Sequence, residues 1–139
     1  MRPRDDEGSG RLRDLHDDEC RALLSEHRVG RIAWNDPAQG PVVLPVSYRS
    51  DGAHVLVRTS AHTELARHFT VGRMAFEIDD YNEATHTGWS VLVRGVATVT
   101  PPGQAPSVED DPAPVVGGTR TFHIQVTVEQ ITGRRVLPT

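Results

Sequence analysis

The sequence contains no lysine, although it carries 15 basic residues, all of which are arginine. Without a lysine amine the chain cannot form a Schiff base, so catalysis through the internal aldimine of pyridoxal phosphate is excluded. A bound phosphate would have to be held by arginine, hydroxyl groups or backbone N–H groups. The missing residue type therefore removes one class of cofactor chemistry and limits how any anion is bound.

Cysteine and long apolar runs are scarce as well. The single cysteine, Cys20, excludes an intrachain disulfide and a zinc site built from several cysteines. Its spacing to Leu23 and Leu24 places it on an apolar helix face, as expected of a core thiol. No apolar run approaches the roughly 18 residues of a membrane span, and the charged start of the chain lacks the apolar segment of a secretory signal. We therefore expect a cytoplasmic protein with no membrane partner.

Positive charge is also limited, because 15 basic residues face 19 acidic ones, for a formal net charge of −4. The two signs alternate along the chain, so no broad basic face is available for a phosphate backbone. A nucleic-acid partner is therefore not expected.

Period-two alternation of apolar and polar residues is the main structural signal in the chain. In the segment around Phe122, Ile124 and Val126, apolar residues occupy one face and polar residues the other. The same kind of pattern predicts six strands, and two short helices accompany them. The strands are expected at 29–34, 41–49, 53–59, 72–79, 88–99 and 121–130, and the helices at 15–27 and 61–69.

The remaining segments complete the predicted organisation. Residues 1–13 are charged and rich in small residues, which predicts a flexible arm, and residues 14–139 are expected to form a single domain. The proline-rich segment 100–118 is predicted to be a long mobile loop, and "ITGRRVLPT" at the end of the chain a turn. Six strands with short connections predict a mainly β protein, a small antiparallel barrel with two short helices.

Several motifs, in their order along the chain, identify a family. They are "VGRIAW", "LPVSY", "VRTS", "MAFEIDD", "GWSVLVRG" and "ITGRR". Together they resemble the pyridoxamine 5′-phosphate oxidase-like family over nearly the whole predicted domain. The resemblance implies a split β-barrel of the FMN-binding type that works as a homodimer, binds FMN at the subunit interface and acts on a small molecule as a flavin-dependent oxidoreductase.

The resemblance also implies which residues contact the cofactor. The candidates fall into three groups: a strand along the ring edge, a phosphate-facing turn, and a pair next to the ring that is contributed across the dimer. In that order they are Pro45, Val46 and Ser47; Arg58, Thr59 and Ser60; and Trp89 and Ser90.

One position departs from the family pattern. Many members carry a lysine or arginine five residues after the threonine, where it binds the phosphate, but this chain has Glu64. A carboxylate repels a phosphate, so Arg58 would have to replace the missing cation. The alternatives are a deazaflavin cofactor, whose longer tail bypasses Glu64, and a non-catalytic ligand-binding barrel that has lost FMN. Haem is a third option, and it needs a histidine ligand.

No separate catalytic or metal site emerges from the sequence. The seven histidines show no His-x-x-x-His spacing, and Asp79, Asp80, Glu83 and His86 are expected to form an acidic surface loop rather than a metal site. Arg134 and Arg135 form a spare cationic pair that we assign to a solvated C-terminal turn. The catalytic residues and the substrate are left open.

Overall fold

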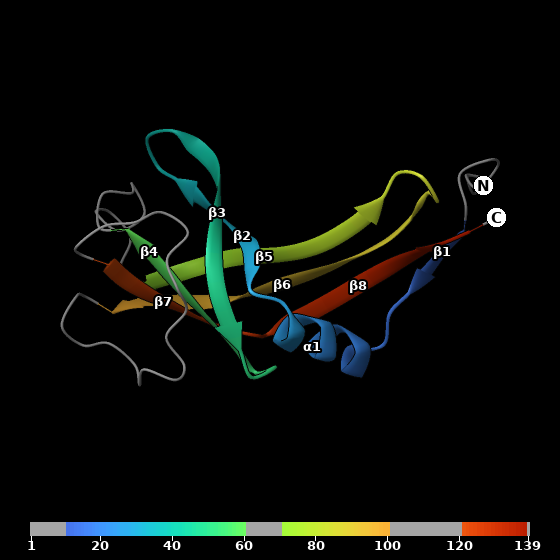
Figure 1. Ribbon diagram of the computed structural model, residues 1–139. Coiled ribbons are helices and arrows are strands. Elements are labelled where there is room, and N and C mark those ends of the chain that lie inside the picture. The colour runs from blue at the N-terminus through green and yellow to red at the C-terminus, as the bar shows by residue number, and fades with distance from the viewer. Residues whose placement is uncertain (1–10, 61–70, 101–120, 139) are drawn as a thin grey trace, which may run out of the picture.

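The computed structural model describes residues 11–60, 71–100 and 121–138 (Figure 1). Within these ranges the chain forms one α-helix and eight strands that pair antiparallel. The helix predicted at 61–69, Glu64 and residues 101–118 of the predicted loop lie outside the described residues. The elements are β1 (Arg11–Asp14), α1 (Asp17–Glu26), β2 (Val29–Asp36), β3 (Gly40–Ser50), β4 (His54–Ser60), β5 (Val71–Asn82), β6 (Thr87–Thr100), β7 (Thr121–Thr127) and β8 (Gln130–Leu137).

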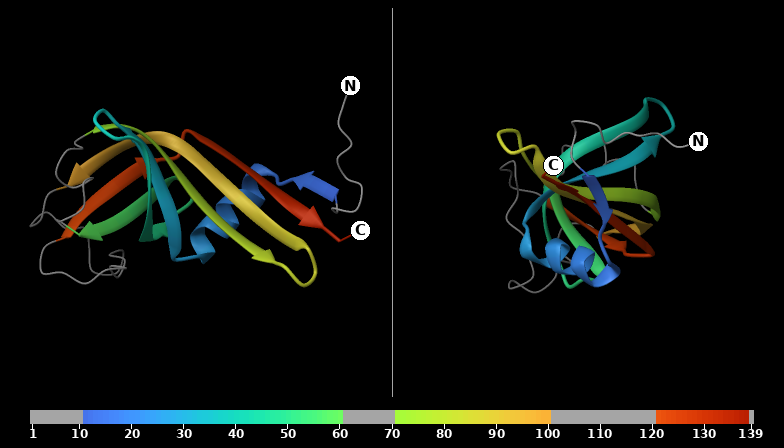
Figure 2. Two further views of the ribbon diagram at one scale, coloured as in Figure 1. Left: turned by 90° about the horizontal axis from the view of Figure 1, so that it is seen from above. Right: turned by 90° about the vertical axis from the view of Figure 1, so that its right-hand side faces the viewer.

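Six of the strands close into a barrel. β6, β5, β2, β3, β4 and β7 are neighbours in that order, and the pairing of β6 with β7 completes the ring (Figure 2). These are the six strands that alternation predicts, and their buried residues follow it. Met74, Phe76 and Ile78 of β5, for example, all point into the core. The mainly β split-barrel fold expected from the sequence is therefore confirmed.

The remaining two strands extend the sheet beyond the barrel. β8 pairs with β6, and β1 pairs with the far edge of β8, so that both run away from the barrel in Figure 1. The expectation of a C-terminal turn was wrong, because "ITGRRVL" is strand β8. The strand has no fully buried side chain, so it lacks the buried apolar face by which the other strands are recognised in the sequence. β1 takes up the last three residues assigned to the flexible arm, with residues 1–10 outside the described part.

Gly95 is the point at which β6 changes neighbours. Residues Gly88 to Arg94 of β6 pair with β8, whereas Ala97 to Thr100 pair with β7. At the junction, a Cβ on Gly95 would collide with the backbone carbonyl oxygen of Thr127. The absence of a side chain lets the β7–β8 connection cross close to β6.

Helix α1 packs over the sheet beside β3 and β8 (Figure 2). Its buried face carries Cys20 and Leu24, as the apolar spacing predicts. The hydroxyl of Tyr48 on β3 donates a hydrogen bond of 2.6 Å to the carbonyl oxygen of Leu24, and the Tyr48 ring meets Phe76 edge to face at 4.7 Å. No helix in the described part of the chain has the length and apolar character to cross a membrane.

Candidate functional site

The three candidates on β3 divide between the two faces of the strand. Val46 points into the core and is 2% exposed, so only Pro45 and Ser47 lie on the outer surface of the barrel. Pro45 is exposed there and pairs with Arg31 of β2, while Ser47 is buried. A ligand on this surface would meet Pro45, Ser47 and the backbone between them.

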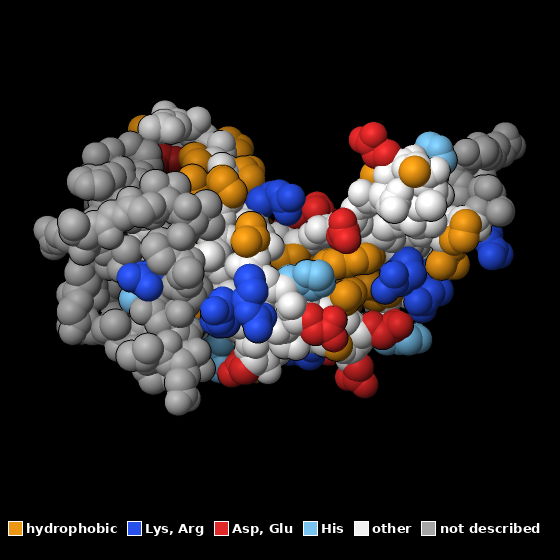
Figure 3. Space-filling model, viewed as in Figure 1, with side chains coloured by type: hydrophobic (Ala, Val, Ile, Leu, Met, Phe, Trp, Pro, Cys, Tyr) orange, Lys and Arg blue, Asp and Glu red, His pale blue; other side chains and the backbone are white. Residues whose placement is uncertain are grey.

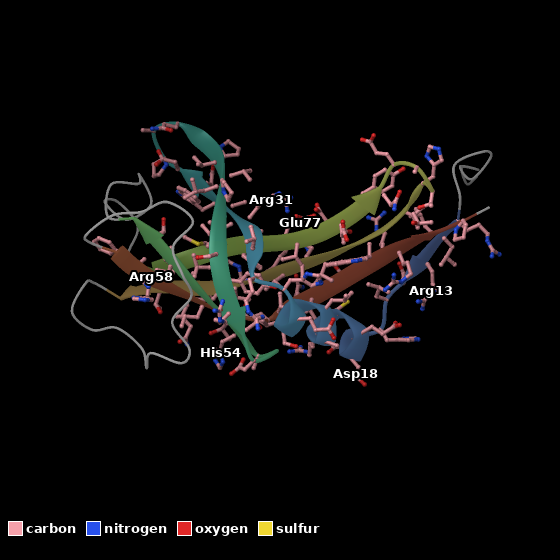
Figure 4. All side chains as sticks on the ribbon, in the orientation of Figure 1. Arg13, Asp18, Arg31, His54, Arg58 and Glu77 are labelled. Carbon is pink, nitrogen blue, oxygen red and sulfur yellow. The ribbon has the colours of Figure 1, made fainter. Side chains whose placement is uncertain are left out.

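Arg58 lies next to Ser47 in the sheet. The two are cross-strand partners between β3 and β4, and His123 of β7 is the partner of Arg58 on its other side. Ser47, Arg58 and His123 therefore form one row on the outer surface, with Arg58 half-buried and His123 only 3% exposed. Figure 4 shows Arg58 at the barrel end of the molecule, on β4.

Thr59 and Ser60 do not join this row. The segment that the resemblance treats as a phosphate-facing turn is still strand here, because β4 runs through Ser60. Thr59 points inward and is 6% exposed, opposite Phe122 of β7. Of the three candidates on β4, only Arg58 has a described side chain on the outer surface.

Trp89 and Ser90 lie at the other end of the sheet, near the start of β6. Their side chains point to opposite faces. Trp89 contacts His27, which follows α1, with ring centroids 4.8 Å apart. Ser90 faces the outer surface, between Asp79 of β5 and Arg134 of β8.

Within one chain the candidates therefore form two groups, one around Ser47 and Arg58 and the other at Trp89 and Ser90. Strands β2 and β5 lie between β3 and β6, and on the other side of the ring β7 pairs with β6 only at Ala97–Thr100, away from Trp89 and Ser90. With strands about 4.8 Å apart, β3 lies roughly 14 Å from β6 across the sheet. One chain alone does not bring the two groups together.

Three charged side chains occupy the surface between these groups. Arg31 of β2 donates to Glu77 at 2.9 Å through Nη1 and to Asp79 at 3.3 Å through Nη2. Glu77 and Asp79 are two residues apart on β5, so both point outward. Partial burial, together with the hydrogen bond and negative charge of Asp79, raises the pKa of Glu77 to about 7, although Arg31 opposes the shift.

Next to this triad an open groove of about 920 Å³ crosses the outer surface of β5, β6 and β8. Figure 4 shows Arg31 and Glu77 at the edge of β5, and the space-filling view is hollowed at the same place (Figure 3). Leu92, Ile131 and Val136 give the groove an apolar part. Its charged lining residues are Asp14, Glu77, Asp79, Asp80, Arg94 and Arg134.

Arg134 and Arg135 do not act as a pair, because neighbouring residues of β8 face opposite ways. Arg134 lines the large groove. Arg135 is the cross-strand partner of Trp89 and lines a smaller pocket of about 250 Å³ with it. The spare cationic pair expected in a turn is therefore divided between two surfaces.

Sequence reasoning missed Arg31 and Glu77 as site residues and placed Asp79 in a loop. Asp79 and Asp80 instead belong to β5, and Glu83 and His86 lie beyond it in the hairpin that leads to β6. The outward alternation of Glu77 and Asp79 was visible in the sequence, but their meeting with Arg31 depends on the pairing of β2 with β5. Among the described residues, no group of three metal-ligating side chains is placed to hold a metal ion.

Comparisons with known proteins match this chain over most of its length. The family model described as pyridoxamine 5′-phosphate oxidase matches residues 16–135. The uncharacterized protein Rv0080 of Mycobacterium tuberculosis is 29% identical over 130 residues, which cover 89% of this chain and 85% of that protein.

The solved structures of similar fold include two FAD-binding proteins. The FAD binding protein of Mycobacterium smegmatis is 28% identical, with a TM-score of 0.66 over 90% of this chain and 98% of that chain. An FAD-binding protein of Mesorhizobium loti has a TM-score of 0.68 at 20% identity, over 91% of this chain and 97% of that chain. At that identity the second likeness shows the fold alone.

Proposed function

The chain belongs to the pyridoxamine 5′-phosphate oxidase family, and we propose that it binds a flavin on the outer surface of its barrel and oxidises or reduces a small molecule by two electrons. The observation that carries the proposal is the extent of the family match, since residues 16–135 include both groups of candidate residues and most of the residues that line the groove. The likeness to the FAD binding protein of Mycobacterium smegmatis, at 28% identity over nearly its whole length, supports a flavin in particular.

The row around Arg58 has the chemistry that a flavin phosphate requires. A guanidinium donates parallel hydrogen bonds to phosphate oxygens, and a hydroxyl and an imidazole beside it add further donors. Arg58 has Ser47 on one side and His123 on the other. This donor set supports binding of the phosphate of FMN, or of the corresponding phosphate of FAD, at the β3–β4 end of the site.

The groove has the properties that suit a flavin ring. Its volume of about 920 Å³ lies within the range of cofactor and ligand pockets. Leu92 offers apolar surface and Ser90 offers a hydroxyl to polar ring atoms, while Trp89, whose side chain points to the opposite face, contributes backbone groups to the groove lining. A bound flavin would supply hydride transfer, while these side chains bind the ring, orient it and limit its contact with water.

We further propose that the working form is a homodimer. The two groups of candidates lie on separate strands of one chain, and a second copy would allow Trp89 and Ser90 of one protomer to complete the row around Arg58 of the other. Large apolar side chains on the outer surface support such an interface. They are Leu12, Val29, Val43 and Tyr81, with 61%, 60%, 64% and 56% of their surface exposed.

Flavin binding is tested by titrating the purified protein with FMN, FAD and a deazaflavin while recording visible absorbance and flavin fluorescence. We expect saturable binding of FMN or FAD with a shifted flavin spectrum. Binding of the deazaflavin alone would favour the deazaflavin-dependent reductase. No saturable binding of any of the three would favour the barrel that has lost its flavin, and the proposal would be rejected.

A mixing experiment tests the shared site directly. Arg58→Gln and Trp89→Ala are expected to weaken flavin binding when each variant is purified alone. If the site combines Arg58 of one protomer with Trp89 of the other, a mixed dimer of the two variants has one intact site. Random exchange would then restore about a quarter of the wild-type sites. No restoration in a mixture that light scattering shows to be dimeric would contradict the shared arrangement.

A further inference from the structure

The contacts of Arg31 with Glu77 and Asp79 serve no role in the proposed binding of the flavin. Both carboxylates line the groove, 31% and 40% exposed, and a single guanidinium spans them at 2.9 and 3.3 Å. Two carboxylates on adjacent outward positions of one strand repel each other, and one cation neutralises only one of them. The repulsion that is left favours one proton bound between the two carboxyl groups.

The rest of the surroundings do not cancel this repulsion. The cross-strand partner of Glu77 on β6 is Leu92, which carries no charge. Arg94 and Arg134, the other cations in the lining of the groove, are exposed, so solvent screens their charges. Arg31 of β2 contacts Glu77 directly, and the other charged groups that line the groove are Asp79 and Asp80 from β5, Arg94 from β6, Arg134 from β8 and Asp14 from β1.

We propose that Glu77 and Asp79 bind a single shared proton, which Glu77 takes up when two electrons enter the groove and gives back when they leave. The shared proton is inferred from the contacts of Arg31 with Glu77 and Asp79, whereas its coupling to electron transfer rests on the proposed flavin binding. Glu77 is the carrier because it is the less exposed of the two carboxyl groups. Its pKa of about 7 places the exchange at the pH of the cell.

When two electrons arrive from a soluble reductant such as a reduced nicotinamide, the added negative charge favours transfer of a proton from water onto the Glu77 carboxylate. When the electrons leave to the substrate as a hydride, the Glu77 O–H bond breaks and its proton goes to the substrate atom that carries the new electron pair. The carboxylate left behind is stabilised by Arg31, and the open groove allows water to reload it.

The first part of the test needs no flavin. Carboxyl carbons of ¹³C-labelled protein are followed by NMR as the pH is raised. One carboxyl is expected to titrate near pH 7, and the titration should disappear in Glu77→Gln and move to lower pH in Asp79→Asn. A matched control is Glu129→Gln, because Glu129 is paired with Arg73 at 2.8 Å and, among the described residues, no second carboxylate is paired with that arginine. If no carboxyl titrates above about pH 6, or if the titration survives in Glu77→Gln, the proposal is overturned whatever the protein binds.

The second part measures the reduction potential of the FMN-loaded protein against pH with a reference redox dye. We expect an additional proton taken up per two electrons in the wild type and in Glu129→Gln around neutral pH, and its loss in Glu77→Gln. An identical pH dependence in wild type and Glu77→Gln would overturn the proton exchange while flavin binding stands. If neither FMN nor FAD binds, the proposed function fails and the coupling to electrons with it, and the NMR titration alone decides whether the proton is shared.

Discussion

Ser47 of β3 and Arg58 of β4 are direct cross-strand partners, which places a hydroxyl beside a guanidinium on the outer surface of the barrel. Neighbouring strands hold such partners at a fixed spacing, so the two side chains are oriented by the sheet and not by a loop. His123 extends the row on the other side of Arg58. In the proposed flavin site, Arg58 would supply from a strand the cation that the sequence lacks at Glu64.

Removal of this cation gives the first prediction. Arg58→Gln should weaken FMN binding roughly tenfold to a hundredfold, because a hydrogen bond to a charged group contributes about 1.5–3 kcal/mol. Fluorescence titration measures the dissociation constant. Arg73→Gln is the matched control, since Arg73 is an exposed arginine paired with Glu129, and it should bind FMN as the wild type does. Equal loss in both variants would mean that Arg58 has no specific role in binding.

A second prediction concerns the junction at Gly95. Gly95→Ala should destabilise the protein by about 1–3 kcal/mol or more, because the added methyl group meets the backbone carbonyl of Thr127, which cannot rotate away. The free energy of unfolding is measured from urea denaturation. Thr98→Ala, an exposed position on the same strand, should stay within about 0.5 kcal/mol of the wild type. A Gly95→Ala protein of unchanged stability would show that the β7–β8 connection has room to move.

The barrel could be predicted from the sequence because its strands each bury one face. Val91 and Val93, for example, are fully buried while Leu92 and Arg94 between and after them face outward. Strand β8 was not predicted, because it is held by backbone pairing with β6 and has no fully buried side chain. The contacts of Arg31 with Glu77 and Asp79 could not be predicted for another reason. Arg31 lies 46 residues from Glu77 in the sequence, and only the register between β2 and β5 brings them together.

Tyr48 gives a third prediction, on the attachment of α1. Tyr48→Phe removes the hydroxyl that donates to the Leu24 carbonyl at 2.6 Å but keeps the ring against Phe76. The free energy of unfolding should fall by about 0.5–1.5 kcal/mol, which is the net contribution of one buried hydrogen bond. The change is measured from the midpoint of urea denaturation. Tyr81→Phe is the control, because Tyr81 is 56% exposed, and it should change stability little. Equal effects of the two substitutions would argue against a role for the buried hydrogen bond.

Cys20 gives a fourth prediction, on reactivity. The thiol is fully buried against β8, and burial, followed by the charges of Asp17 and Glu19, raises its pKa. Both effects disfavour the thiolate, so the folded protein should react with a thiol reagent only as fast as it opens. The rate of colour formation with an aromatic disulfide reagent is measured at rising urea concentration. A fast reaction without urea would show that Cys20 is reached from the folded state.

The last prediction follows from the sign of the Glu77 shift. The folded protein binds a proton at Glu77 up to a pKa of about 7, whereas the unfolded chain releases it near the ordinary value of 4.5. Between these values the folded state holds more protons, so the contribution of Glu77 to stability is full below pH 4.5 and is lost as the pH rises through about 7. Glu77→Gln cannot titrate, and the stability of the wild type relative to this variant should therefore fall between pH 5 and pH 8. Urea denaturation of both proteins at the two pH values measures the difference, with Glu129→Gln as a control that should follow the wild type. A constant difference between wild type and Glu77→Gln would show that Glu77 is ionised throughout this range.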